Sequence, residues 1–337
     1  MRLVYEIENL EPTEICVDGK NYLVYHEILF TMLDGKSISA LTNTPSSQTC
    51  PNCKAKPNDF EIYTKNPSKY PVHVYTLDFG MSPLHMYLRA LEWILNIAYR
   101  LEIKVWKITK DRRPTVKNLM LKIKEGFKKH LNLIVGRVNK GAGTSNTGNV
   151  ARKIFDNPNV TADITGVDVR LISNIATMLS AINSGFRINV ETYQAIGSQT
   201  AELAYELYSW YKMPQSMHRL CYHVADYVSG CPVTIGQTSE EAIETSHKMA
   251  LHALKHHSRQ HSYKTMTGDM ARYRLMQTDP QINGHYTFKR LGKKVSKPFS
   301  QEVRNLLESS LPATAELEIF EEDDNTIEIR DFMGDIL

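Results

Sequence analysis

The stretch LHMYLRALEWILNIAYR, residues 84–100, decides the fold class of this 337-residue chain. Its apolar residues recur at steps of three and four, the spacing of one face of an α-helix: Leu84, Leu88, Leu91, Leu95 and Ala98. Pro83 stands near the first turn, where proline is tolerated because its missing N–H would have no helical partner. We therefore expect a long amphipathic helix.

Downstream of this stretch the helical pattern continues. Apolar residues alternate with lysines after Arg113-Pro114, and GNVARKIF predicts a short helix after a glycine-rich loop. Residues 162–211 carry apolar residues at helical spacing, with a break at Ser184-Gly185. Another helix begins near Ser239. The chain is predicted to be α+β but mostly α.

Upstream, the pattern changes to that of a strand. Residues 21–33, NYLVYHEILFTML, form an almost continuous apolar run that ends at Asp34-Gly35. Such a run before a turn predicts a buried strand with Asp34 at its end. The polar stretch from Leu41 to Asp59 predicts a loop that contains Cys50 and Cys53.

Composition is that of a globular protein with an uneven charge distribution. The net charge is only +3, but residues 107–140 are rich in Lys and Arg and the last twenty residues are acidic. No apolar run approaches the roughly 20 residues of a membrane span, and no P-loop, Rossmann or serine-hydrolase motif is present. The odd set of five cysteines favours a reducing compartment, so we expect a soluble intracellular protein.

The motif Cys50-Pro-Asn-Cys53 is the strongest signal for a metal site, because two thiolates at this spacing both reach one tetrahedral zinc. His218 and His223 are the natural partners, and a helix would have to bend or end between them for both rings to face one ion. Cys221 is a rival ligand. The alternative is that the cysteines are ordinary loop thiols and the histidines bond other polar groups.

Two carboxylates offer a second kind of site. Asp34 at a strand end and Glu244 on a helix are the type of pair that binds Mg²⁺ or Mn²⁺ in phosphoryl transfer. Asp-Gly also marks an ordinary turn, and acids in a first helical turn complement the helix dipole. Spacing alone leaves both interpretations open.

Basic residues near these carboxylates suggest contacts with the phosphates of DNA. Lys248, Lys255 and Arg259 follow Glu244 along the chain, and Arg152 and Lys153 follow the glycine-rich loop, where a helix start favours phosphate. A solvated helix face has the same composition.

Several segments, taken in order from about residue 28 to 280, resemble the Transib transposase family and, more distantly, the catalytic subunit of the V(D)J recombinase. They are FTMLDGKSISALTNTPSSQTCPNC, LDFGMSPLHMYLRALEWILNIAYRL, GTSNTGNVARKIF, and MHRLCYHVADYV followed by TSEEAIETSHK. The resemblance implies an RNase H-like catalytic core interrupted by a long helical insertion that carries zinc. It also implies a nuclear protein that acts as a homodimer on the terminal-repeat DNA of a transposon.

By this resemblance Asp34 and Glu244 are the second and third acids of a catalytic triad, and Cys50, Cys53, His218 and His223 hold structural Zn²⁺. The implied segments are a partial RNase H-like core at 1–48, the zinc-carrying helical insertion at 49–235, the catalytic-Glu helix and basic core at 236–297, and a weakly packed acidic tail at 298–337. Only 33 residues precede Asp34, fewer than the family places between its first and second acids. The first acid is therefore expected to be absent, and the chain is expected to be inactive alone.

Three functions follow as hypotheses. The first is a DNA transposase or recombinase core of the DDE type, with metal-dependent strand cleavage and transfer at transposon ends. The second is a non-catalytic, zinc-stabilised DNA- or chromatin-binding module derived from a transposase. The third is a helical interaction protein without metal or nucleic acid.

Overall fold

The structure is a computed structural model, which describes residues 9–25, 35–136, 138–139, 143–144, 146–231, 233–238, 241–279, 281–282, 295–308 and 316–319. Most of these residues are helical, as the sequence predicts. Among the described residues, no helix is long and apolar enough to cross a membrane.

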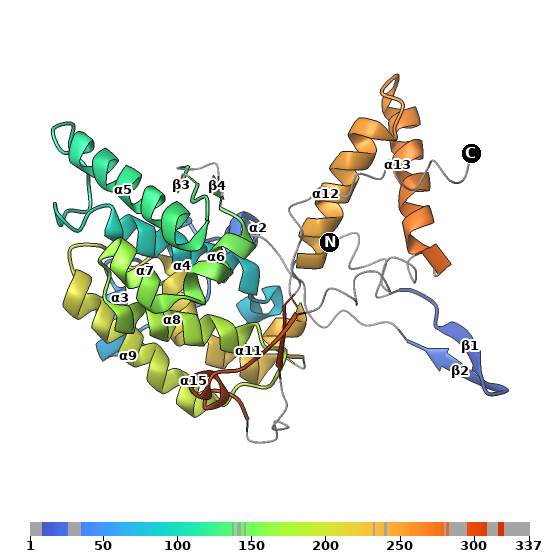
Figure 1. Cartoon of the computed structure of the whole chain (residues 1–337). Helices are drawn as coiled ribbons and strands as arrows, with labels where there is room; N and C mark the ends of the chain where they lie inside the picture. Colours follow the sequence, from blue (N-terminus) through green and yellow to red (C-terminus); the bar gives the residue numbers. More distant parts are fainter. Residues whose placement is uncertain are drawn as a thin grey trace.

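A bundle of helices, here called the body, forms the larger part of the molecule (Figure 1). Its elements are α2 (Gly35–Leu41), α3 (Phe60–Lys65), η1 (Pro67–Lys69), η2 (Val74–Phe79), α4 (Pro83–Ala98), α5 (Arg113–Leu131), α6 (Gly148–Phe155), α7 (Pro158–Thr165), α8 (Val169–Ile182), α9 (Val190–Tyr208), α10 (Gln215–Tyr222), α11 (Val224–Gly230) and η3 (Ile235–Thr238). The short strands β3 (Val138–Asn139) and β4 (Gly143–Thr144) pair between α5 and α6.

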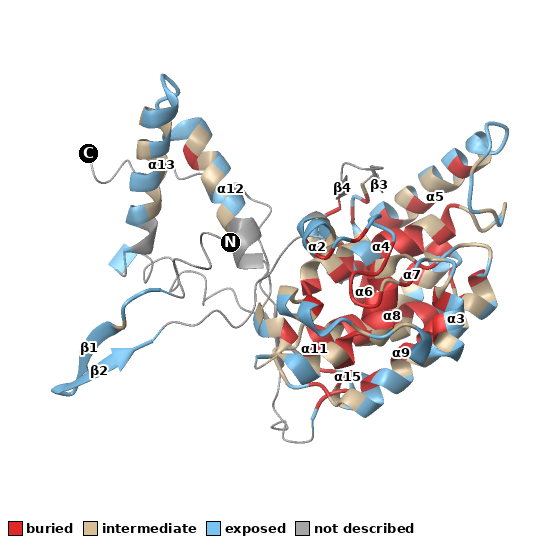
Figure 2. Ribbon diagram, turned by 180° about the vertical axis from the view of Figure 1, so that it is seen from behind, coloured by how far each residue is buried: buried red, intermediate tan, exposed pale blue. Residues whose placement is uncertain are grey.

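The central helix α4 is the one that the opening stretch predicts, and its bounds confirm that prediction. Ser82 caps it by accepting a hydrogen bond from the backbone N–H of His85, and Pro83 occupies the first turn. Leu91 and Leu95 are fully buried. Helices α6, α8 and α10 pack around α4, so the apolar face that the sequence shows becomes the centre of the core (Figure 2).

Helices α8 and α9 form the next layer, and local signals define their ends. Asp168 caps α8 and Asn189 caps α9 through side-chain oxygens. The loop between the two helices contains Ser184-Gly185, where the sequence predicts an interruption of the helical pattern. Helix α9 approaches α10 very closely at Gly197, where a Cβ atom would overlap the carbonyl oxygen of Cys221. This contact positions α10, which carries His218, against α9.

The first described strands differ from the expectation of a buried strand. β1 (Thr13–Val17) and β2 (Lys20–Val24) form an antiparallel hairpin whose residues are all exposed. Asp18 and Gly19 both have positive φ angles of 51° and 74°, as a tight hairpin turn requires. The prediction of burial was therefore wrong for residues 21–25, because apolar composition alone does not supply a partner layer. Residues 26–34 lie outside the described part of the chain.

The start of the expected acidic tail is packed, and that expectation was wrong for residues 299–307. Phe299, Val303, Leu306 and Leu307 are buried, and α15 (Gln301–Arg304) contacts α8. Apolar residues here recur at a helical spacing that the acidic character of the later residues obscures. Strand β5 (Val295–Pro298) pairs with β6 (Glu316–Ile319). The three described sheets have two strands each.

Helices α12 (Glu241–His256) and α13 (Tyr263–Thr278) pack against each other as a helical hairpin (Figure 1). Among the hairpin residues whose burial is described, only Ala253 is buried. Figure 2 shows the contrast between the exposed hairpin and the buried interior of the body.

Candidate metal centre

The four residues predicted to bind zinc lie together in the structure. One donor atom from each of Cys50, Cys53, His218 and His223 lies within 4.8 Å of the others, and all four residues are buried. The two halves of this cluster come from segments about 165 residues apart. Chance packing rarely gathers two thiols and two imidazoles inside a core, so the group is a candidate metal site.

The cysteine half is a tight turn. The backbone N–H of Lys54 donates to the carbonyl of Cys50 at 2.9 Å, and the N–H of Cys50 donates to the carbonyl of Ala55 at 2.8 Å. Lys54 adopts a left-handed conformation with a φ of 60°, which lets the chain reverse directly after Cys53. Both sulfur atoms consequently lie on the same side of the turn.

The histidine half depends on the end of a helix. Helix α10 stops at Tyr222, His223 is its C-terminal cap with φ of -106° and ψ of -1°, and α11 begins at Val224. This is the break that the five-residue spacing requires, because five residues on a continuous helix would turn the two rings apart. The Nε2 atoms of His218 and His223 lie 3.2 Å apart.

The distances fit a tetrahedral zinc ion. With zinc at about 2.3 Å from sulfur and 2.0 to 2.1 Å from nitrogen, neighbouring donors lie about 3.3 Å apart for two nitrogens and about 3.6 Å for sulfur and nitrogen. The observed separations are 3.2 Å between the two Nε2 atoms and 3.4 Å between Cys53 Sγ and His218 Nε2. The residues present therefore fit a Cys2His2 site.

Asp226 orients His223 from outside the cluster. Its Oδ2 lies 2.8 Å from Nδ1 of His223, so Nδ1 carries the proton that this bond needs and Nε2 faces the cluster. The sequence reasoning missed this residue. Its signal was present in the three-residue spacing between His223 and Asp226 on the first turn of α11.

Aromatic rings hold His218. Phe60 of α3 stacks on its imidazole with ring centroids 4.1 Å apart, and Tyr63 meets it edge-on at 4.6 Å. These contacts leave the ring little rotational freedom. They also exclude water, which strengthens the interaction of the donors with a cation.

The two buried thiols of the cluster have pKa values that shift in opposite directions. Burial opposes ionisation of Cys50, but hydrogen bonds from Cys53, His218 and His223 hold its pKa well below the usual value. The pKa of Cys53 is raised, because its sulfur bonds the Cys50 sulfur and is itself buried. The pair thus accepts one negative charge readily and a second one poorly. A divalent cation would favour both thiolates.

The histidines differ in a related way. Burial lowers the pKa of His218, which favours the neutral imidazole that a metal needs. Burial also acts to lower the pKa of His223, but Asp226 and Cys50 together raise it to about 9. A bound cation would favour the neutral ring of His223.

A buried polar network anchors the cysteine turn to the helices. The side-chain amide of Asn52 donates to Thr76 Oγ1 and to Tyr227 Oη, each at 3.0 Å. Arg219 donates to the same Tyr227 hydroxyl at 2.5 Å and to the carbonyl of Gly80 at 3.1 Å. Asn52 lies between the two cysteines, so the network fixes their turn relative to α10 and α11.

Cys221, the rival ligand, is buried but is not part of the cluster. Its backbone carbonyl faces Gly197 of α9, and burial raises the pKa of its thiol to about 12. It is therefore a packing residue.

The two side chains of the predicted carboxylate site lie outside the part of the chain that the structure describes. Asp34 lies outside the described residues, and Glu244 and Lys248 are placed only by their backbone on α12. The position of Glu244 on a helix agrees with the expectation, but the separation of its carboxylate from that of Asp34 stays untested.

The remaining predicted DNA contacts have differing surroundings. Arg152 and Lys153 lie in the last turn of α6, not at its start, because Thr147 caps the helix and places its first residue at Gly148. The guanidinium of Arg152 lies over the ring of Tyr87 at 5.3 Å, whereas Lys153 is exposed. Lys255 is exposed in the last turn of α12, and Arg259 is bound to Asp269.

No protein-family model matches the chain, and no curated protein is similar to it in sequence.

Proposed function

We propose that this chain is a zinc-stabilised, DNA-binding module of the Transib transposase type, built on an RNase H-like core with a helical zinc insertion. The observation that carries the proposal is the Cys50, Cys53, His218 and His223 cluster. The resemblance names these four residues, and they meet in the interior although they come from opposite ends of the helical body.

Electrostatics supports a nucleic-acid partner. Helix α5 buries Val116, Ile123 and Phe127 and exposes a series of basic side chains: Arg113, Lys117, Lys122, Lys128 and Lys129. Figure 1 shows α5 at the edge of the body, where a duplex can approach its outer face. Phosphates along the DNA backbone are the natural partners of such a row.

Metal analysis tests the zinc half of the proposal. Purified protein should contain one zinc ion per chain, and a Cys50→Ser/Cys53→Ser variant should contain none. Cys16→Ser is the control, because Cys16 is an exposed cysteine of the β1–β2 hairpin. Wild-type protein free of zinc would instead favour a helical interaction protein without metal.

Salt-dependent DNA binding tests the other half. A Lys117→Ala/Lys122→Ala/Lys128→Ala variant should bind duplex DNA more weakly, and the slope of log K against log salt should fall by about 1 for each phosphate that the variant no longer neutralises. Lys20→Ala/Lys56→Ala/Lys69→Ala removes the same charge from exposed positions elsewhere. Equal binding by both triple variants would contradict a role for α5.

The same resemblance makes Asp34 and Glu244 ligands of Mg²⁺ or Mn²⁺ in strand cleavage. Titration of Mn²⁺ into wild type and Glu244→Gln tests whether the site exists. Metal-dependent nicking that disappears in Asp34→Ala would show an active recombinase, whereas zinc binding without Mn²⁺ binding favours a non-catalytic DNA- or chromatin-binding module.

Homodimer formation and a nuclear location also belong to this proposal. Light scattering with and without DNA measures the first, and imaging of the tagged full chain measures the second.

A further inference from the structure

Four aromatic side chains from two distant segments form a row on the body, here called the aromatic row. Trp106 lies in the loop between α4 and α5, and its ring centroid is 4.7 Å from that of Tyr211. Trp210 lies 5.9 Å from Tyr211, and Tyr208, at the end of α9, lies 6.2 Å from Trp210. Helices α5 to α9 separate Trp106 from the other three residues in the chain, so tertiary packing, and not the periodicity of one helix, brings Trp106 to Tyr211.

The outer member of the aromatic row is exposed to solvent. Trp106 is 38% exposed, whereas Trp93 in the core is 3% exposed. Trp210 and Tyr211 are half-buried and Tyr208 is buried, so the row runs from the interior to the surface. A single exposed apolar side chain needs no explanation, but an exposed tryptophan backed by further rings is a continuous apolar surface. Such a surface favours a flat ligand that can cover the indole.

Contacts on two sides limit the freedom of the loop that carries Trp106. Arg112 donates from Nη1 to the carbonyl oxygen of Ile103 at 3.2 Å, which closes the loop at its base. The guanidinium of Arg100 lies over the ring of Tyr211, 5.2 Å from its centroid, and fixes the partner of Trp106 by a cation–π contact. A ligand that stacks on Trp106 therefore meets a preformed surface, so less conformational freedom is lost on binding.

The charges beside the aromatic row favour an anionic ligand. Residues 100–113 contain six Lys and Arg but only two acidic residues, Glu102 and Asp111. The exposed basic side chains of this segment are Lys104, Lys107, Lys110, Arg112 and Arg113. Single-stranded nucleic acids bind surfaces of this composition, because bases stack on aromatic rings while phosphates pair with cations. A proline-rich peptide also binds aromatic surfaces, but the excess of cations gives it no advantage.

We propose that Trp106 and Tyr211 form a stacking platform for the unpaired bases of single-stranded DNA, with the neighbouring lysines binding its phosphates. This inference rests on the proposed DNA-binding function and adds a second kind of DNA contact to it. The loop of Trp106 leads directly into α5, whose exposed face carries the basic side chains proposed to bind a duplex (Figure 1). The two surfaces adjoin in the chain, so a DNA with a duplex part and a single-stranded end suits both.

Binding of a labelled oligo-dT strand to the full chain at fixed salt tests the proposal, with fluorescence anisotropy as the measurement. Trp106→Leu should weaken binding by roughly 5- to 150-fold, because it keeps an apolar side chain but removes the face on which one base stacks. Trp106→Phe keeps a ring and should restore most of the affinity. Tyr75→Leu is the matched control, because Tyr75 is an exposed aromatic residue of a different segment, η2.

The salt dependence separates stacking from charge. Trp106→Leu should leave the slope of log K against log salt unchanged, whereas Lys104→Ala/Lys107→Ala should lower it by about 0.7 for each phosphate that is no longer neutralised. Circular dichroism checks the fold of each variant. If Trp106→Leu does not fold, quenching of tryptophan fluorescence by oligo-dT in wild type, and its decrease in Trp106→Phe, still tests the contact.

Equal affinity of wild type and folded Trp106→Leu for oligo-dT would overturn the proposal. Binding of oligo-proline in place of oligo-dT would also overturn it, because the aromatic row would then be a peptide site. Duplex binding by wild type without binding of oligo-dT would contradict the stacking platform alone, whereas failure of wild type to bind duplex DNA would contradict the proposed function.

Discussion

The body and the α12–α13 hairpin are both helical, but different interactions hold them. The body has a continuous apolar core, and its candidate metal ligands are completely buried within it. The hairpin has little described core and is held by caps, ring stacking and the Arg259–Asp269 ion pair. Periodic apolar residues thus specify the first region, whereas local polar contacts specify the second.

Loss of the proposed zinc ion should separate the two regions most clearly. Cys53→Ser should destabilise the body by several kcal/mol, because a structural zinc contributes folding free energy directly and its removal leaves buried donors without a partner. Thermal unfolding followed by tryptophan fluorescence measures this. The three tryptophans, Trp93, Trp106 and Trp210, all lie in the body. An unchanged melting temperature would mean that the cluster is held by packing alone.

Truncation of one leucine in each region gives the next largest contrast. Leu95→Ala in α4 should lower the free energy of unfolding by about 2 to 5 kcal/mol, because it opens a cavity in the core. Leu251→Ala in α12 should change it by less than about 0.5 kcal/mol, because Leu251 is 55% exposed. Urea unfolding of both variants checks this. Similar decreases in the free energy of unfolding for both variants would show that Leu251 is packed against another part of the protein.

Asp226→Ala should lower the affinity for zinc more than it lowers the stability of the fold. Removing the carboxylate that orients His223 should weaken zinc binding by about 10- to 100-fold, as removal of such an outer partner does in other sites. Competition with a chromophoric chelator measures the affinity. Glu206→Ala on α9 is the control, since Glu206 is exposed. An Asp226→Ala variant that binds zinc as tightly as wild type would show that Asp226 does not contribute to zinc affinity.

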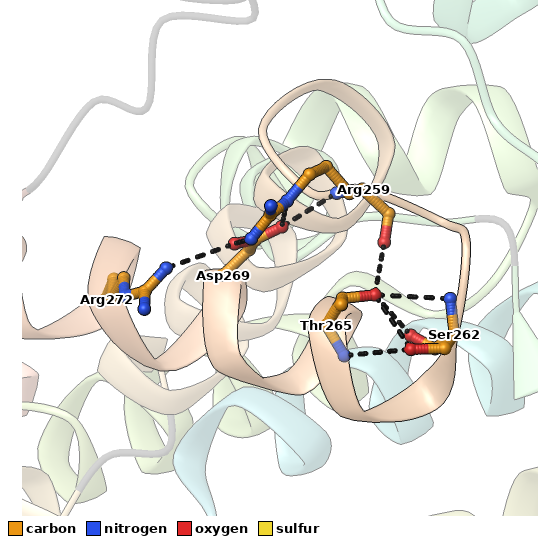
Figure 3. Close-up of polar contacts among 5 residues, drawn as sticks. All are labelled: Arg259, Ser262, Thr265, Asp269 and Arg272. Atoms are coloured by element: carbon orange, nitrogen blue, oxygen red, sulfur yellow. Dashed lines mark hydrogen bonds and ion pairs between the residues drawn. The ribbon is translucent and has the colours of Figure 1, made fainter.

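The smallest effect is expected at the turn of the hairpin. Hydrogen bonds from Arg259 lower the pKa of Asp269 to about 2. This value lies below the ordinary one of about 3.9, so the pair stabilises the hairpin fully above pH 4 and loses that contribution as pH falls through 2. In Arg259→Ala the pKa of Asp269 should rise toward its ordinary value, while the backbone N–H of residue 259 and the guanidinium of Arg272 still favour the carboxylate (Figure 3). An NMR titration of Asp269 follows the change, and identical midpoints in both proteins would show that the pair is broken in solution.

Sequence reasoning performed best where one physical signal dominates. The bounds of α4, the short helix after Thr147 and the end of α10 before His223 follow from periodicity, capping and ligand spacing. The four candidate metal ligands follow from donor chemistry. In contrast, Asn52 and Phe60 act through tertiary contacts that no local pattern marks. The predictions of a buried strand at β2 and of a weakly packed segment at residues 299–307 were both wrong for one reason. Burial depends on which segment of the chain lies opposite.

The separation of the candidate metal ligands along the chain has a consequence for biosynthesis. A ribosome that adds about 5 to 20 residues per second needs roughly 8 to 33 seconds to travel the 165 residues from Cys53 to His218. During that interval the nascent chain exposes a reduced thiol pair without its imidazole partners. The interior helices α4 to α9 emerge in the meantime, so the core must stay open, or reopen, to admit the last two donors.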